Sequence, residues 1–316
     1  MVVVSWYVIT FIVILSFANG DERNLVDQFP IAKNGRSLVE SAPIHSNFMA
    51  PFLFPNLYKC LETTIDPKYY FKSQSGEDKW LWRNIFQHFP ANETIGGTFL
   101  EIGGLDGIHL SNSYFFEKKL DWRGILIEGH PANNIRKSQG QRGNAAIFTV
   151  AVCETVDNSP GNLTFSTNGG ATGAALKHVA SDFRNSYHKG DTGGLTVSCI
   201  PIQSIIDSTG LLDIDLFSLD VEGAELVVLE TINFAVTNIR VLVIELDGSN
   251  EAKDEQVRKL VLAQGFTTMK DRIREECGYK LRGCTKNEVF INPNFVTKKS
   301  SRKPKDYYHF GTGVKC

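Results

Sequence analysis

A glycine-rich turn that follows an acidic residue is the stretch of this sequence with the clearest chemical meaning. Residues 99–107 read FLEIGGLDG, an apolar run that ends at Glu101-Ile102 and passes into glycines. Such a turn belongs between a strand and a helix, and the ligands of open α/β sheets bind at the carboxyl ends of the strands. A dinucleotide fingerprint starting at Gly103 would also need glycines where Leu105 and Ile108 stand. A dinucleotide is therefore not the expected ligand.

The turn fits a different pattern, acid-x-Gly-x-x-x-Gly. Glycines let the backbone approach a ligand closely, and carboxylates accept hydrogen bonds from it. An acid inside the turn, Asp106, would repel a pyrophosphate but attract an ammonium or a sulfonium. We therefore predict that this turn contacts a cofactor. The predicted contacts are Glu101, Gly103, Gly104, Asp106 and Gly107.

A second acid, Glu128, ends the next apolar run, 21 residues after Gly107. A carboxylate at a strand end can accept hydrogen bonds from both hydroxyls of a ribose, each worth about 1.5–3 kcal/mol. Together with the turn, this predicts a nucleoside without phosphates, and S-adenosylmethionine is the common cofactor of that kind. The alternative is that Glu128 only caps the turn after its strand.

A third group of acids lies in residues 219–225, LDVEGAE, where a strand passes into a helix. Helix N-termini stabilise acids by about 0.3–1 kcal/mol each, so capping is the competing role for Asp220 and Glu225. We predict that Asp220 lies over the methyl end of the cofactor and Glu222 near the methyl acceptor. Glu245, which ends the next strand, is a candidate for the wall of the site.

The same carboxylates have oxygens that suit a divalent cation. A metal held by Asp220, Glu222 and Glu245 is therefore the alternative to the metal-free site that we predict. The sequence has no histidine-rich ligand set for zinc.

These motifs require an α/β fold to position them. Short apolar runs alternate with helical stretches, which is typical of a mainly parallel sheet with helices on both faces. The predicted strands are 98–102, 124–128, 146–152, 216–220, 240–246, 266–270 and 288–291. The predicted helices are 74–89, 110–120, 132–138, 202–208, 224–232 and 251–264. The glycine-rich residues 153–200 are predicted to form an insertion after the third strand, over one edge of the sheet, where a substrate lid could sit.

The ends of the chain differ from this domain. Residues 2–18 carry no charge, so 1–20 is predicted to be a cleaved signal peptide or a single N-terminal anchor. We predict an irregular, proline-containing stem at 21–72, the α/β domain at 73–292 and a basic tail at 293–316. The chain is expected in the secretory pathway, in the lumen, anchored or secreted.

Cysteines and sequons agree with that location. The six cysteines are an even number without zinc-knuckle spacing, which predicts disulfides in an oxidising compartment; buried thiols are the alternative. The preferred pairs are Cys277–Cys284 and then Cys153–Cys199. Asn92 and Asn162 begin glycosylation sequons.

The composition is that of a globular protein, with 42% hydrophobic and 22% charged residues. The net charge is −2, and the tail holds several of the basic residues, which leaves the rest of the chain more acidic. Such a surface binds phosphates poorly, so we predict no nucleic-acid partner. His178 and His188 are predicted to be exposed residues of the insertion.

Three runs of the sequence resemble the FkbM-type methyltransferases. They are SQSGED at 73–78, FLEIGGLDGIHLSNSYFFEKKLDWRGILIEGHP at 99–131 and LDVEGAELVVLE at 219–230. The similarity extends from residue 73 to about 264. It implies a Rossmann-like fold, S-adenosylmethionine as the methyl donor, and O-methylation of a hydroxyl, often on a sugar or a natural product.

The resemblance also implies roles for single residues. Glu101, Gly103, Asp106 and Glu128 would bind the cofactor, with Asp220 at the site. Gln74 and Asp78 would close over it. The family often has Pro-Asn where this chain has Gly129-His130. That departure leaves His130 as a candidate for acid–base catalysis beside Asp220 and Glu222.

We therefore predict an S-adenosylmethionine-dependent O-methyltransferase of the secretory pathway. Its acceptor would be a small-molecule or glycan hydroxyl, and it would meet a membrane only through an N-terminal anchor. The main alternative is a non-catalytic trafficking or adaptor protein, because metazoan secretory-pathway relatives are similar to the protein Star, a membrane-anchored factor. A secreted protein that binds a small ligand is a third possibility.

Overall fold

The computed structural model describes residues 70–89, 91–154, 160–191, 194–270 and 286–295. The predicted targeting segment, nearly all of the stem, most of the tail and the cysteines 277 and 284 lie outside these ranges. Within them, no helix is both long enough and apolar enough to cross a membrane.

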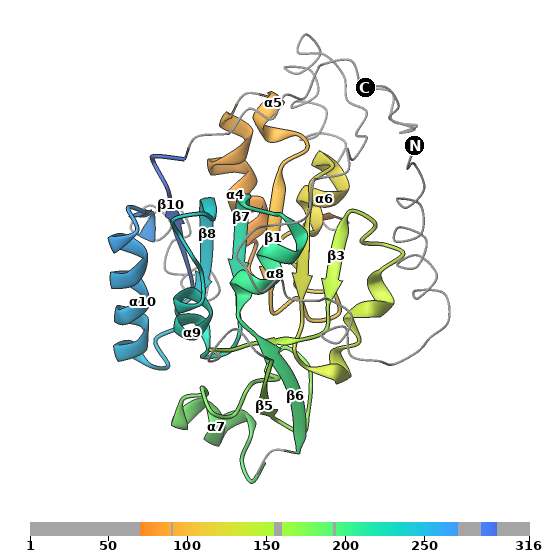
Figure 1. Ribbon diagram of the computed structural model, residues 1–316, viewed down its shortest axis with the longest axis vertical. Coiled ribbons are helices and arrows are strands. Elements are labelled where there is room, and N and C mark those ends of the chain that lie inside the picture. The colour runs from red at the N-terminus through yellow and green to blue at the C-terminus, as the bar shows by residue number, and fades with distance from the viewer. Residues whose placement is uncertain (1–69, 90, 155–159, 192–193, 271–285, 296–316) are drawn as a thin grey trace, which may run out of the picture. The chain divides into compact units, whose positions relative to one another are not determined.

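A seven-stranded sheet forms the centre of the described fold, in the order β3-β2-β1-β7-β8-β10-β9 (Figure 1). The strands in chain order are β1 (Thr98–Ile102), β2 (Arg123–Ile127), β3 (Ala145–Phe148), β7 (Asp213–Leu219), β8 (Asn238–Glu245), β9 (Thr267–Thr268) and β10 (Asn287–Ile291). The first five in the spatial order are parallel, and β10 is antiparallel to both of its neighbours. The chain builds outward from β1 to β3 on one side and from β7 on the other. The strand order therefore reverses between β1 and β7, the place where α/β sheets bind ligands.

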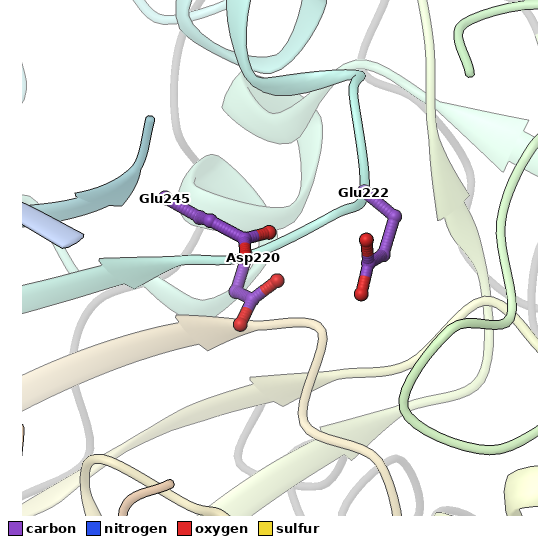
Figure 2. A group of neighbouring side chains, drawn as sticks. All are labelled: Asp220, Glu222 and Glu245. Carbon is purple, nitrogen blue, oxygen red and sulfur yellow. The ribbon is translucent and has the colours of Figure 1, made fainter. Parts of the chain in front are cut away.

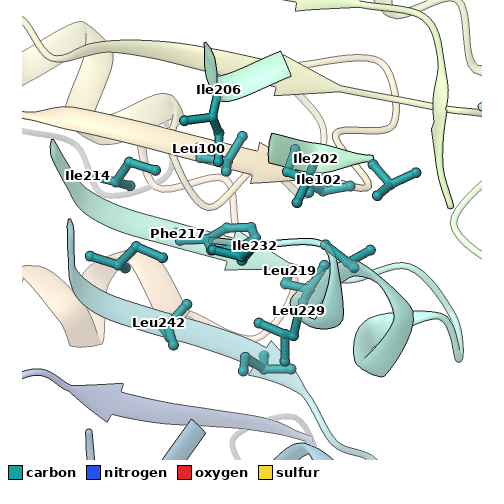
Figure 3. Packing of buried hydrophobic residues seen from close by; sticks show 14 of the residues in the cluster. Leu100, Ile102, Ile202, Ile206, Ile214, Phe217, Leu219, Leu229, Ile232 and Leu242 are labelled. Carbon is teal, nitrogen blue, oxygen red and sulfur yellow. The ribbon is translucent and has the colours of Figure 1, made fainter. Parts of the chain in front are cut away.

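Helices cover both faces of this sheet. They are α4 (Glu77–Asn84), α5 (Ala91–Thr94), α6 (Tyr114–Leu120), α8 (Ile202–Thr209), α9 (Glu225–Glu230) and α10 (Glu251–Ala263), with a 3-10 turn η3 (Phe86–His88). Because side chains alternate along a strand, Leu100 and Ile102 pack with α8 and α9 on one face (Figure 3). Phe99 packs with α4 and α6 on the other face. The strands are thus buried on both sides, as their apolar sequences predict.

The insertion, together with the two residues before it, forms a second, three-stranded sheet with the order β4-β6-β5. Its elements are β4 (Ala151–Val152), β5 (Gly161–Phe165), α7 (Ser181–Tyr187) and β6 (Leu195–Ile200). It lies beside the carboxyl ends of β1, β2 and β3, drawn in green in Figure 1. The predicted disulfide Cys153–Cys199 is present in this insertion.

Several predicted boundaries are wrong for local reasons. The predicted strand 146–152 is divided between β3 and β4, which belong to different sheets. The predicted helix 132–138 consists of two 3-10 turns, η4 (Pro131–Asn133) and η5 (Ile135–Ser138), interrupted by Asn134 in the left-handed region at φ 55°. The predicted helix 110–120 begins only at Tyr114, because the residues before it form a loop that binds Glu101.

Candidate active site

A pocket lies at the carboxyl edge of the parallel strands, beside the reversal between β1 and β7. Four acids that end or follow neighbouring strands line it: Glu101, Glu128, Asp220 and Glu245. The insertion supplies part of the wall, with aromatic side chains from β5 and α7. These are Phe165, Phe183 and Tyr187. The sheet therefore brings the acids predicted from three distant motifs into one pocket.

Gly103 allows β1 and β7 to meet at the floor of this pocket. The amide of Asp220 donates to the carbonyl of Ile102 at 3.1 Å. A Cβ at Gly103 would lie 1.7 Å from the carbonyl oxygen of Asp220, and the glycine has a φ of +83°. Both the left-handed backbone and the close approach require glycine here. Gly103 lines the pocket, and the close backbone approach that it allows is to Asp220, just after β7.

The other two glycines of the turn face away from the pocket. A Cβ at Gly107 would lie 2.3 Å from Ser138 Oγ, and one at Gly104 would lie 3.0 Å from Ile135 Cδ1. Neither glycine is among the residues that line the pocket. The structure thus corrects their predicted cofactor contacts, because their small size lets the turn pack against η5.

The carboxylate of Glu101 is occupied by the loop that leads to α6. Its oxygens accept hydrogen bonds from Ser111 Oγ at 2.8 Å, from the amide of Asn112 at 2.7 Å, and from Ser113 Oγ. The side chain is 3% exposed. Glu101 lines the pocket, and its carboxylate holds this loop. Its contact with a cofactor stays a prediction.

Buried Arg142 fixes the same loop from the other side. Its guanidinium donates to Ser111 Oγ at 3.1 Å, to Ser113 Oγ at 2.6 Å and to the carbonyl of Gly107. It also forms an ion pair with Glu117 of α6. The loop between β1 and α6 is therefore held by two buried charged groups of opposite sign.

The structure does not bring Asp106 or Asp78 into the pocket. Asp106 is exposed, and its carboxylate accepts from the amides of Ile108 and His109 at 2.9 and 2.7 Å. Asp78 is fully buried and accepts from Ser73 Oγ and from backbone amides including that of Lys72. Burial raises the pKa of Asp78 to about 6. Both acids thus stabilise turns, which corrects their predicted contact with a cofactor.

The segment that Asp78 holds does reach the pocket. Gln74 and Glu77 line it. Closure of Gln74 over a cofactor, which the resemblance implies, stays a prediction. Glu77 accepts hydrogen bonds from the amide of Ser75 and from Asn287 Nδ2, both at 2.8 Å. Asp78 is thus placed to position Gln74 without touching a ligand itself.

Glu128 has the position predicted for a ribose-binding acid. It follows β2, lines the pocket and is 7% exposed. Its two oxygens accept from the amide of Leu105 at 2.9 Å and from the amide of His130 at 2.6 Å. Burial raises the pKa of Glu128 to about 7, although these hydrogen bonds and one from Asn133 oppose the shift. A carboxylate has about four acceptor positions, so the two backbone amides leave two for a diol, provided that Asn133 releases its hydrogen bond.

His130 is not placed for acid–base catalysis. The ring is 1% exposed and does not line the pocket. Nδ1 accepts from the amide of Ala132 at 3.2 Å, and Nε2 lies 3.0 Å from the carbonyl of Ser166, to which it must donate. Both ring nitrogens are therefore used to join η4 to the insertion, which corrects the predicted catalytic role.

The carboxyl groups of Asp220, Glu222 and Glu245 form an acidic cluster, with oxygens within 4.8 Å of one another (Figure 2). Burial, followed by the charge of Glu245, raises the pKa of Glu222 to about 9. Burial also raises the pKa of Asp220 and of Glu245, which are hydrogen-bonded to each other; the charge of Glu222 adds to the shift of Asp220, and the charge of Asp220 adds to the shift of Glu245. The cluster can share protons with a hydroxyl, and its spacing also suits the divalent cation considered as the alternative.

Glu225 and Lys253 hold the turn that carries this cluster. Glu222 has a φ of +54°, which is strained for a residue with a side chain. The carboxylate of Glu225 accepts from the amides of Val221 and Gly223, and it is paired with Lys253 of α10. Glu225 thus holds the turn that precedes α9 and does not cap the helix, and Asp220 lines the pocket.

The histidines of the insertion are less exposed than predicted. His188 is 4% exposed, and its Nε2 lies 2.8 Å from the carbonyl of Thr172. His178 is partly buried and lines a smaller pocket that shares Glu222 and Glu245 with the main one. Burial lowers the pKa of His178. The prediction is therefore wrong for His188, whose ring joins two segments of the insertion.

Several pocket residues were not predicted from the sequence. They are Asn112 and Ser218 near β1 and β7, and Lys286 and Asn287 at the start of β10. Asn112 lies in the polar run Ser111-Asn112-Ser113, which interrupts a helical pattern, and that interruption is the one signal that could have revealed it. The others depend on pairing between distant strands.

Comparison with known proteins defines the family. The model of a family described as "Methyltransferase FkbM domain" matches residues 101–281, more than half of the chain. The chain belongs to the FkbM methyltransferase family. Membership indicates S-adenosylmethionine as the cofactor of this FkbM domain. A comparison with curated proteins found no match.

Among solved structures, the FkbM domain is similar to two other methyltransferases at low scores. One is described as a sarcosine dimethylglycine methyltransferase from Galdieria sulphuraria, with 10% identity, a TM-score of 0.31, and coverage of 68% of this chain and 84% of that chain. The other is Haemonchus contortus phosphoethanolamine N-methyltransferase 1, in complex with phosphoethanolamine and S-adenosylhomocysteine. It has 12% identity, a TM-score of 0.29, and coverage of 76% and 45%. At these scores neither similarity bears on the substrate of this chain.

Proposed function

We propose that this protein uses S-adenosylmethionine to methylate a hydroxyl group of a glycan or a small molecule in the secretory pathway. One observation carries the proposal. A single pocket joins Glu128, which suits a ribose diol, to the carboxyl groups of Asp220, Glu222 and Glu245. The proposed cofactor site, at Glu128, and the proposed polar site for an acceptor, at the acidic cluster, are thus two parts of one pocket at the carboxyl edge of the sheet.

The residues near Glu128 fit an adenosine. Apolar side chains line the pocket on this side and offer a surface for a flat base. They are Ile102, Val150, Val152, Leu163 and Phe165. Hydrogen bonds from two backbone amides hold the Glu128 carboxylate in place, so little reorganisation is needed when a diol binds.

The acidic cluster fits the acceptor. When bound, the cofactor supplies a methyl group on a sulfonium, which an oxygen nucleophile attacks in line. Asp220 is placed to accept the hydroxyl proton, because its pKa is raised to about 7 and part of it is ionised near neutral pH. Glu222, with a pKa raised to about 9, holds its own proton at that pH and is assigned to the surroundings of the acceptor. A general base contributes roughly 10²–10⁴ in rate, whereas correct orientation of the acceptor can contribute up to about 7–11 kcal/mol. Positioning by the pocket is thus the larger effect.

Two observations support the secretory location. Cys153 and Cys199 form a disulfide, and disulfides persist in oxidising compartments. Asn162 of the second sequon is exposed on β5, where a glycan would not displace the core. We propose that a membrane is met only through the N-terminal segment. Similarity to the Star-like members of the family is part of the same proposal.

Calorimetry with S-adenosylmethionine on the protein, Glu128→Ala and Asp106→Asn tests the cofactor site. We expect micromolar binding to the parent and a loss of at least about 1.5 kcal/mol in Glu128→Ala. Asp106→Asn is the matched control, because it changes an acid of the same region that lies outside the pocket, and its affinity should equal that of the parent. Absence of heat from all three proteins would favour the non-catalytic adaptor.

Transfer of a labelled methyl group tests the reaction itself. Fractions of secretory-pathway glycans and small molecules would serve as acceptors, and base treatment would distinguish methyl ethers, which survive, from methyl esters. We expect alkali-stable label with the parent and strongly reduced label with Asp220→Asn. Label in an amine or a carboxylate would contradict O-methylation of a hydroxyl.

A further inference from the structure

The loop between β1 and α6 buries a polar side chain with an unsatisfied atom. Asn112 is 8% exposed and lines the pocket. Its backbone amide donates to Glu101, and its Nδ2 donates to Ser218 Oγ at 2.8 Å. Its Oδ1, however, is buried and has no hydrogen-bond partner among the residues that the structure describes. A buried acceptor without a donor is costly and rare in folded proteins, so a donor from a ligand is the natural explanation.

Asn112 lies beside β1 and β7, at the pocket edge of the sheet. Glu101 and Ser218 are paired residues on the neighbouring strands β1 and β7, and Asn112 is hydrogen-bonded to both. This places it at the reversal of the strand order. In the sheet, Glu128 follows β2 on one side of β1, and Asp220 follows β7 on the other. Asn112 therefore lies between the acid proposed for the ribose and the acidic cluster.

The loop is held before any ligand binds. Glu101 receives three donors from Ser111, Asn112 and Ser113, while Arg142 donates to both serine hydroxyls. These bonds also limit what Glu101 can offer to a ligand. The sequence motif predicts that Glu101 contacts the cofactor, but its oxygens are taken up by the loop that it orders.

We propose that Asn112 Oδ1 accepts a hydrogen bond from the α-ammonium group of the methionyl part of S-adenosylmethionine. This inference rests on the proposed cofactor. An amide oxygen needs a donor, and neither the sulfonium nor the carboxylate of that cofactor carries one. The ribose hydroxyls are assigned to Glu128, and the adenine amine lies beyond the ribose. The hydroxyl of the methyl acceptor is assigned to the acidic cluster. The ammonium is therefore the donor of the cofactor that remains for an acceptor on the β7 side of β1.

Two nucleosides distinguish this contact from a merely structural role. S-adenosylhomocysteine has the ammonium group, and 5′-methylthioadenosine shares the adenosine and sulfur but has no amino acid. Calorimetry of both compounds would be carried out on the folded parent, Asn112→Leu and Asn112→Asp. Leucine is similar in size but has no acceptor, whereas aspartate keeps an acceptor and adds negative charge.

For Asn112→Leu we expect binding of S-adenosylhomocysteine to weaken about 10- to 100-fold. Its binding of 5′-methylthioadenosine should change by less than about twofold, and Asn112→Asp should bind S-adenosylhomocysteine at least as well as the parent. Equal weakening of both compounds in Asn112→Leu, or loss in Asn112→Asp as large as in Asn112→Leu, would overturn the assignment of Asn112 alone. Failure of the parent to bind either compound would overturn the proposed cofactor together with this contact.

Discussion

Part of the pH dependence of the affinity for S-adenosylhomocysteine should come from one carboxyl group, that of Glu128. Burial raises the pKa of Glu128 to about 7 in the protein without ligand. Its proposed role is to accept hydrogen bonds from the ribose, which favours the ionised form. Binding should therefore strengthen as the pH rises towards 7 and become constant above about pH 8. The variant Glu128→Gln removes this titration with little change in side-chain size.

The size of the effect follows from the fraction of Glu128 that is ionised. With a pKa of about 7, roughly a tenth of the carboxyl groups are ionised at pH 6 and roughly nine-tenths at pH 8. The dissociation constant should then be about tenfold larger at pH 6 than at pH 8, which corresponds to about 1.4 kcal/mol. In Glu128→Gln, binding should be weaker by about 1.5–3 kcal/mol at pH 8, and this part of the pH dependence should be absent.

The assay is calorimetry of S-adenosylhomocysteine binding from pH 5.5 to 8.5, with the two proteins compared at each pH. Other groups that titrate in this range, including Asp78 and Asp220, are common to both proteins, so the difference between the two curves isolates Glu128. Parallel curves for the parent and the variant would refute the reasoning. A parent that binds more tightly at pH 6 than at pH 8 would refute it as well.

Three further predictions concern stability in thermal or denaturant unfolding. Gly103→Ala should lower the free energy of unfolding by about 3 kcal/mol or more, because its Cβ would lie 1.7 Å from the carbonyl oxygen of Asp220. Gly143→Ala is the control, since no described atom beyond its chain neighbours lies within 4 Å of the added Cβ, and it should change that free energy by less than about 0.5 kcal/mol. Similar values for the two variants would contradict the close approach at Gly103. Since burial raises the pKa of Glu222 to about 9, the folded protein keeps a proton that the unfolded chain loses near its ordinary value of 4.5. The free energy of unfolding should therefore fall as the pH rises between these two values, by up to about 1.4 kcal/mol per pH unit. In Glu222→Gln this fall should be smaller, and an equal fall in the variant and the parent would refute the prediction. Replacing Cys153 and Cys199 by serine should lower the free energy of unfolding by about 4 kcal/mol, because the disulfide closes a loop of 46 residues in the unfolded chain. An unchanged midpoint of the unfolding transition would show that the disulfide does not constrain the unfolded chain.

The strands and the acids at their ends were accessible from the sequence. The predicted strand 98–102 coincides with β1, because a run buried on both faces is apolar throughout and therefore easy to recognise. Glu128, Asp220, Glu222 and Glu245 were predicted as parts of one site, and all four line the same pocket. The reason is geometric, since parallel strands end at a common edge.

The hydrogen-bond partners of the candidate site residues could not be predicted from the sequence. Asp106 and Glu101 have the same charge and lie in one motif, yet one closes a turn at the surface and the other holds a buried loop. The sequence predicts His130 as a candidate for acid–base catalysis, but its ring lies beside the carbonyl of Ser166, 36 residues further along the chain. A hydrogen bond of this kind depends on the fold of the insertion, which has no regular pattern in the sequence.

The sequence alone determined the α/β class, the cofactor type and the acids that gather at one edge of the sheet, because alternation of apolar runs and residue charge are properties of the chain itself. The tertiary structure decided which of those acids keep acceptor capacity for a ligand. Donors from a nearby loop occupy the carboxylate of Glu101, and Asp106 lies at the surface. Within the described part of the chain, Asn112 Oδ1 has no donor. Hydrogen-bond capacity is settled only when every nearby donor has been placed, and most of those donors come from distant parts of the chain.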